Sequence, residues 1–102
     1  MNLSFAAKSL LLELALQYNR DNNGRLIATK KQLARRGWGS QSTVTRALAE
    51  LVAAGMVHKT VQGGRPHRAN WYALTWFALY PDPKFDFDSY GSFRRGAYRD
   101  DL

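Results

Sequence analysis

The sequence predicts a small α+β domain built from three helices and one antiparallel β-hairpin. Residues 4–18 and 40–54 place apolar side chains at helical spacing, whereas residues 56–61 and 70–76 are rich in β-branched and aromatic residues. The chain has 102 residues and no cysteine. This length is sufficient to bury a modest core without disulfide bonds.

The first helix is expected to begin after Ser4, whose hydroxyl suits an N-cap, and to run to about Tyr18. Its buried stripe comprises Leu3, Ala7, Leu10, Leu11, Leu14 and Tyr18. The run of Asn and Gly at residues 19–24 then ends the helix. Residues 25–28 are short and partly apolar, which suits a small strand.

Thr29 is a suitable cap for a second helix over residues 30–36, with Leu33 and Ala34 facing inward. Two glycines flank Trp38 and break this helix. We expect the Trp38 ring to pack against the core, the alternative being that it stacks on a sugar or a base.

A third helix is expected to start at Ser40 and to stop at Gly55, a residue type common just past helix C-termini. Its buried stripe comprises Val44, Leu48 and Leu51, flanked by Ala47 and Val52. Its opposite face comprises Ser42, Thr45, Arg46, Ala49 and Ala53. This face has short side chains and one guanidinium in place of the Glu and Lys pairs of a solvated helix, which indicates contact with a partner.

The order helix, short strand, helix, turn, helix, strand, basic loop, strand is that of a winged helix-turn-helix. Three motifs carry a closer resemblance: Q-S-T-V-T-R-x-L-x-x-L-x-x-x-G-M-V at residues 41–57, Gly63-Gly64-Arg65, and Tyr72-x-Leu74-Thr75. Over residues 4–76 the chain resembles the DNA-binding lobe of MarR-type regulators and small winged-helix proteins of phages and plasmids, including the DNA-binding domains of replication initiators.

The resemblance implies that the third helix is a recognition helix and that the hairpin is a wing. The chain departs from the MarR pattern, in which long dimerising helices lie on both sides of the lobe. We therefore expect neither a MarR-style dimer nor ligand-controlled release of DNA.

Positive charge is concentrated in the middle of the chain. The formal net charge is +7, and ten Lys or Arg but only two acids lie between Arg20 and Arg68. A basic centre favours a polyanionic partner, of which nucleic acid is the common soluble example. The alternative is a basic surface that only keeps the protein soluble.

Residues on the third helix are the candidates for contacts with DNA bases. These candidates are Gln41, Ser42, Thr43, Thr45 and Arg46. Arg46 is the main specificity candidate, because a guanidinium can bond O6 and N7 of guanine together. The alternative is that Ser40 or Ser42 merely caps the helix and that Arg46 is a solvated charge.

Basic and hydroxyl residues around the second helix are the candidates for contacts with the DNA backbone. These candidates are Arg25, Thr29, Lys30, Lys31, Arg35, Arg36 and Ser40. Contacts of this kind fix the register of a protein on DNA without reading its sequence. The alternative is an exposed cationic helix face with no partner.

The loop at residues 62–69 is the candidate for contact with the minor groove. The residues expected to make this contact are Gly63, Gly64, Arg65, His67 and Arg68. The glycines allow a tight backbone, and Arg65 is the best candidate for a narrow, electronegative groove. The alternative is a structural hairpin in which His67 is only a turn residue.

We expect the domain to span residues 1–80 and residues 81–102 to form an aromatic and charged C-terminal tail. The first helix has a second apolar face, formed by Phe5, Leu12 and Leu16, which needs a cover. The tail offers the aromatic residues Phe85, Phe87, Tyr90 and Phe93. We expect the tail to pack across the first helix of its own subunit or of a twofold-related one. The rival interpretation is an unstructured interaction arm.

The sequence favours a sequence-specific protein that binds double-stranded DNA as a homodimer and acts as a transcriptional repressor or regulator of a bacterium, phage or plasmid. One alternative is control of plasmid or phage replication or partition at repeated origin sites. An alternative of another class is a protein-interaction adaptor that uses the winged-helix scaffold.

We expect no enzymatic activity, because the sequence has no P-loop, no paired carboxylates in its basic centre and no serine beside a plausible base. With two histidines and no cysteine, a metal site is not expected. No cofactor, small-molecule ligand or membrane association is expected. The expected location is the bacterial cytoplasm, on the nucleoid or a plasmid.

Overall fold

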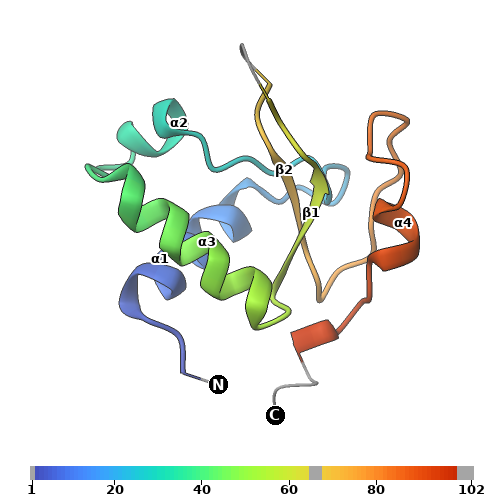
Figure 1. Ribbon diagram of the computed structural model, residues 1–102, viewed down its shortest axis with the longest axis horizontal. Helices are drawn as coiled ribbons and strands as arrows, with labels where there is room; N and C mark the ends of the chain where they lie inside the picture. Colours follow the sequence, from blue (N-terminus) through green and yellow to red (C-terminus); the bar gives the residue numbers. More distant parts are fainter. Residues whose placement is uncertain (1, 65–67, 99–102) are drawn as a thin grey trace.

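Three helices precede a two-stranded antiparallel sheet, and a one-turn helix follows it. The computed structural model describes residues 2–64 and 68–98, and of Tyr90 only the backbone. The elements are α1 (Phe5–Gln17), α2 (Lys30–Ala34), α3 (Gln41–Ala53), β1 (Val57–Val61), β2 (Trp71–Leu74) and α4 (Ser89–Ser92) (Figure 1). This α+β arrangement is compatible with a winged-helix layout.

Each of the first three helices begins at the cap that the sequence predicts. The Ser4 hydroxyl accepts a hydrogen bond from the Ala7 amide, the Thr29 hydroxyl from Gln32, and the Ser40 hydroxyl from Thr43. Each cap satisfies an amide that has no partner inside its helix. The start of α3, which is central to the functional argument, is thereby fixed by local hydrogen bonds.

Gly55 ends α3, as expected. Its φ of 74° lies in the left-handed region. The Gly55 amide donates to the Val52 carbonyl at 3.1 Å, and the Met56 amide donates to the Leu51 carbonyl at 3.0 Å. These two bonds form a Schellman motif, which turns the chain directly from α3 into β1.

The sheet is a short antiparallel hairpin with one irregularity. Val57 pairs with Leu74 and Lys59 with Tyr72, and the register shifts between Lys59 and Val61. Leu26 adds a single bridge to Tyr72, through hydrogen bonds of 3.0 and 2.8 Å. The strand expected at residues 25–28 is therefore reduced to one bridging residue.

The core lies between α1, α3 and the hairpin. Its large buried side chains are Leu10, Leu14, Leu26, Leu33, Val44, Leu51, Tyr72 and Leu74. Trp38 is half-buried and packs against this core, as expected. Ala34 is exposed, so its predicted inward position is wrong, because α2 ends there after a single turn and a half.

A buried asparagine joins the turn after α1 to the end of the hairpin. The side chain of Asn23 accepts a hydrogen bond from the Leu74 amide at 2.8 Å and donates to the carbonyls of Leu74 and Ala78, both at 3.0 Å. A buried amide needs such partners to offset its loss of water. The 19–24 turn is therefore a structural joint as well as a helix stop.

The tail packs against the hairpin and not against α1. The Asp86 amide donates to the Thr60 carbonyl at 2.8 Å, and the Gln62 amide donates to the Asp86 carboxylate at 2.7 Å. Phe85 is 8% exposed and lies against Gly24. Figure 1 shows the tail and α4 on the side of the hairpin that faces away from α1 and α3.

The expected docking of the tail on the first helix of its own subunit is therefore wrong. The reason is that the end of β1 offers backbone groups that need hydrogen-bond partners and a site for Phe85, whereas Phe5, Leu12 and Leu16 on α1 have no side-chain hydrogen-bonding groups. Phe5, Leu12 and Leu16 stay 87%, 61% and 64% exposed.

Candidate nucleic-acid interface

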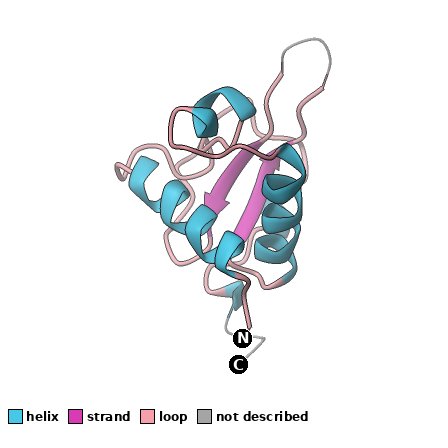
Figure 2. Cartoon of the chain, turned by 90° about the vertical axis from the view of Figure 1, so that its left-hand side faces the viewer, coloured by secondary structure: helices cyan, strands magenta, loops and turns pink. Residues whose placement is uncertain are grey.

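An open groove of about 650 Å³ runs between α3, the start of α2 and the hairpin. Figures 1 and 2 both place α2 at the same end of the molecule as the described residues that follow β1 and precede β2. The groove is lined by Ala28, Thr29, Lys30, Gln41, Thr45, Leu48, Ala49, Val52, Ala53, Lys59, Arg68, Asn70 and Tyr72. Three elements that are distant in sequence thus form one concave surface.

The residues predicted to contact bases lie on two flanks of α3. Gln41 and Thr45 are exposed and line the groove. Arg46 is also exposed but borders a smaller hollow on the α1 side, together with Ser4 and Glu50. The helix therefore presents a hydrogen-bonding and apolar flank toward the hairpin and a charged flank toward α1.

The small hydroxyl residues at the start of α3 are partly occupied by the helix itself. Ser40 caps the Thr43 amide, and its hydroxyl lies 3.0 Å from that of Ser42. The Thr45 hydroxyl donates to the Gln41 carbonyl at 3.0 Å. Thr43 is half-buried. Among these residues, the exposed Ser42 and the methyl group of Thr45 are the parts best placed to contact a partner.

Glu50, which was not singled out from the sequence, fixes the α1 side of this surface. Its Oε1 accepts from the Ser4 amide at 3.0 Å and its Oε2 accepts from the Ser4 hydroxyl at 2.5 Å. The hydrogen bond from the Ser4 hydroxyl lowers the pKa of Glu50, and the Ser4 amide and the charge of Arg46 act in the same direction. A contact spanning 46 residues leaves no local signal in the sequence.

Three cations border the groove, and one of them was not predicted. Lys30 and Arg68 lie where the sequence suggested. Lys59, the additional residue, pairs with Tyr72 across the sheet, and its ammonium donates to the Gln62 side-chain carbonyl at 2.8 Å. Lys59 lies two residues after the buried Val57, and this spacing could have predicted that it shares the α3-facing side of the strand. Among the described residues lining the groove there is no Asp or Glu, so the rim is purely cationic.

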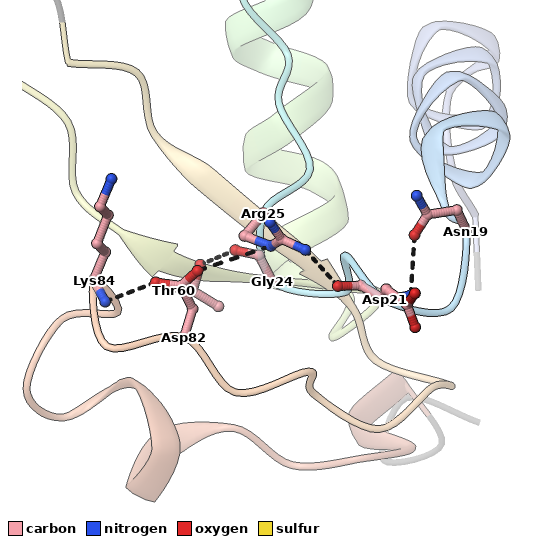
Figure 3. Close-up of polar contacts among 7 residues, drawn as sticks. All are labelled: Asn19, Asp21, Gly24, Arg25, Thr60, Asp82 and Lys84. Atoms are coloured by element: carbon pink, nitrogen blue, oxygen red, sulfur yellow. Dashed lines mark hydrogen bonds and ion pairs between the residues drawn. The ribbon is translucent and has the colours of Figure 1, made fainter.

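Two of the predicted backbone contacts are engaged within the chain. Arg36 pairs with Glu13 at 3.0 Å, and the hydrogen bond and charge of Glu13 raise the pKa of Arg36. Arg25 donates to the Asp21 carbonyl and lies 3.9 Å from the Asp82 carboxylate of the tail (Figure 3). Neither residue lines the groove. These internal partners make both arginines weaker candidates for phosphate contacts than Lys30, Lys59 and Arg68.

The remaining predicted contacts with the backbone divide between the groove and its surroundings. Thr29 lines the groove but also caps α2. Lys31 and Arg35 are exposed on α2 and the turn after it, outside the groove lining. Their charges would add to the positive field around the site without a fixed position in it.

The base of the hairpin loop is held by its own hydrogen bonds. Gly64 and Arg68 exchange two backbone bonds of 3.0 and 2.9 Å. The Gly63 amide donates to the Asn70 side chain at 2.6 Å, and a Cβ at Gly63 would collide with the Arg68 carbonyl. The predicted contacts Arg65 and His67 lie outside the described residues.

The face of the hairpin turned away from the groove is covered by the tail. His58 contacts the Ser89 carbonyl at 3.2 Å and meets the Phe93 ring edge-on at 5.4 Å, and burial lowers the pKa of this histidine. Phe87 is fully exposed. The Tyr90 side chain lies outside the described residues. One face of the hairpin is thus structural, and only the other is open to a partner.

In residues 2–64 and 68–98, no cluster of three or more potential metal-ligating side chains is found, and no helix has the length and apolar character required to cross a membrane. Comparison of the chain with models of protein families, with curated proteins and with solved structures gave no match.

Proposed function

We propose that this chain is a winged helix-turn-helix protein that binds double-stranded DNA in a sequence-specific manner and regulates transcription. The observation that carries the proposal is the groove beside the exposed face of α3, whose rim consists of Lys30, Lys59 and Arg68 and whose described lining contains no acid. A concave cationic surface next to an exposed helix suits a duplex, which offers a phosphate backbone beside a groove wide enough for a helix.

In this proposal, α3 lies in the major groove and the hairpin loop reaches the adjacent minor groove. Lys30, Lys59 and Arg68 contact the phosphates of the strand that passes between them. Arg46, on the other flank of α3, contacts a guanine through O6 and N7. Its neighbour Glu50 is engaged with Ser4 and holds α1 against the recognition helix.

The tail supports the function indirectly, by covering the hairpin face that does not meet DNA. The described part of the tail, residues 81–98, carries three acids and three basic residues. The hairpin therefore has a basic face toward the groove and a nearly neutral face toward the tail. This asymmetry favours a single orientation of the protein on a polyanion.

We also propose that the active form is a homodimer, because one module makes too few contacts for useful specificity. Support for a second copy comes from the exposed apolar side chains Phe5, Leu12 and Leu16, which share one face of α1 with Lys8 after the tail has packed elsewhere. A twofold pair of such faces would bury all six apolar side chains.

Selection of bound fragments from a random duplex library tests the proposal. A sequence-specific dimer is expected to enrich a motif with twofold symmetry and half-sites about one helical turn apart. The Arg46→Ala variant is expected to lose preference at one position of each half-site, whereas Lys59→Ala weakens binding to all fragments alike. If the folded protein binds fragments but enriches no sequence motif, sequence-specific binding is contradicted.

A further inference from the structure

From Thr45 to Ala53 the α3 wall of the groove is lined with methyl groups, and Gln41 is the hydrogen-bonding residue at its start. Thr45, Ala49 and Ala53 are exposed along this wall, and Val52 between them is 44% exposed. Leu48 and Tyr72 continue the apolar surface toward the floor. A solvated helix face of this length would normally carry charges, and none of these residues has one.

The geometry of Thr45 assigns its methyl group, and not its hydroxyl, to this wall. The hydroxyl donates to the Gln41 carbonyl one turn earlier, at 3.0 Å. This back-bond occupies the hydrogen that the hydroxyl could otherwise donate to a base. The γ-methyl group is therefore what Thr45 contributes to an occupant of the groove.

Of the two side-chain amides in the groove, Asn70 is occupied within the hairpin, whereas Gln41 is exposed at the start of α3. The Asn70 side-chain oxygen accepts from the Gly63 amide at 2.6 Å, and its nitrogen contacts the Tyr72 hydroxyl at 3.1 Å. The remaining strong feature is the cationic rim formed by Lys30, Lys59 and Arg68. The groove thus fits an occupant with an anionic outer edge and an apolar inner edge.

We infer that the groove holds one strand of duplex DNA with the C5 methyl groups of its thymines against Thr45, Ala49 and Val52. This inference rests on the proposed function and specifies which feature of the DNA bases the hairpin-facing flank of α3 contacts. Thymine is the base whose major-groove edge carries a methyl group, and Ala and Thr methyls are its usual contacts. The C5 position lies on the side of the pyrimidine nearest its own backbone, so phosphates on the rim and methyls on the wall belong to one strand.

The thymine methyl can be removed without altering base pairing, by replacing thymine with uracil. Alternating d(A-T) and d(A-U) duplexes of equal length are titrated with the intact protein at one low salt concentration. The protein is expected to bind d(A-T) more tightly, by about fourfold for each methyl that becomes buried. Alternating duplexes of guanine with cytosine or with 5-methylcytosine provide the reciprocal pair, in which the methylated duplex is expected to bind more tightly.

Two conservative variants connect the preference to the groove. Thr45→Ser removes only the methyl group and keeps the hydroxyl bonded to Gln41, and Val52→Thr replaces one methyl with a hydroxyl of the same shape. Both variants are expected to reduce the ratio of the affinity for d(A-T) to the affinity for d(A-U), which is the quantity compared with the wild type. Lys31→Ala, which lies outside the groove lining, is expected to keep the preference. Circular dichroism verifies that each variant is folded.

Equal affinity of the wild type for d(A-T) and d(A-U) would overturn the thymine inference while leaving DNA binding intact. A preference for d(A-T) over d(A-U) that persists in both Thr45→Ser and Val52→Thr would also overturn it, because the thymine methyl groups would then contact another part of the protein. Failure to bind any of the four duplexes would instead contradict the proposed function.

Discussion

Ser4 and Glu50 connect the N-cap of α1 to the last turn of α3. The two oxygens of the Glu50 carboxylate accept hydrogen bonds from the amide and the hydroxyl of Ser4, while the same hydroxyl caps the Ala7 amide. A carboxylate at a helix N-terminus is also favoured by the helix dipole. This contact sets how α1 lies beside the exposed face of α3, next to Arg46.

Replacing Glu50 with Gln is expected to lower the free energy of unfolding in a way that depends on pH. The folded state lowers the pKa of Glu50 below its ordinary value. The carboxylate therefore stabilises the fold at neutral pH, and this contribution is lost as the pH falls through the lowered pKa. Urea denaturation of both proteins at pH 7 and at acidic pH measures the difference, which should be largest at pH 7.

The Ser4→Ala variant and the double variant provide the control for this contact. If Ser4 and Glu50 act through each other, the two substitutions together destabilise the protein by less than the sum of their separate effects. If the two substitutions change the free energy of unfolding additively, or if Glu50→Gln lowers it equally at both pH values, the Ser4–Glu50 contact does not stabilise the fold as described.

Gly55→Ala is expected to destabilise the protein by at least about 1–2 kcal/mol, because an L-residue at this φ is strained. A Cβ would also lie 2.8 Å from the Ala97 backbone carbon. Gly39 is the matched control, since its Cβ would meet no atom within 4 Å. Thermal denaturation that finds Gly55→Ala as stable as Gly39→Ala would argue against the described α3 terminus.

Phe85→Ala is expected to cost about 3 kcal/mol, the usual range for truncation of a buried aromatic. Phe85 is 8% exposed, contacts Gly24 and meets the Trp71 ring edge-on at 6.4 Å. Phe87→Ala should change stability by less than about 0.5 kcal/mol, because Phe87 is fully exposed. Similar decreases in the free energy of unfolding for the two variants would show that the tail does not dock on the hairpin through Phe85.

Leu12→Asp and Leu16→Asp are expected to convert a homodimer into a monomer without loss of folding. Both side chains are more than half exposed, so a carboxylate costs little in the single chain but is buried in the proposed pair. Light scattering measures the mass, and Lys31→Ala, at an exposed residue of α2, serves as the control. A wild-type protein that is monomeric at high concentration, alone and on DNA, would contradict the proposed dimer.

The elements of the fold follow closely from the sequence because their signals are local. Ser4, Thr29 and Ser40 cap the helices that they precede, and Gly55 stops α3, since each acts on backbone groups within a few residues. The exposed face of α3 is predictable for the same reason, because helical spacing alone assigns it.

The packing of the tail and the pairing of charges depend on residues distant in sequence. Phe85 fits beside Gly24 and not on α1, a choice that composition cannot reveal. Arg36 pairs with Glu13, 23 residues away, and this makes it a weaker candidate for a phosphate contact than its neighbours in the sequence. Lys59 joins the groove only because the hairpin register places it beside α3.

The salt dependence of duplex binding measures whether the cations of the groove contact DNA phosphates. Binding of the wild type is compared with that of Lys30→Ala/Lys59→Ala/Arg68→Ala and of Lys84→Ala, a cation in the tail. We expect the wild type to bind at low salt, and the triple variant to reduce the slope of log K against log salt by about 0.9 for each lost phosphate contact, with Lys84→Ala unchanged. No binding by the wild type, or equal slopes for the wild type and the folded triple variant, would contradict a DNA-binding groove.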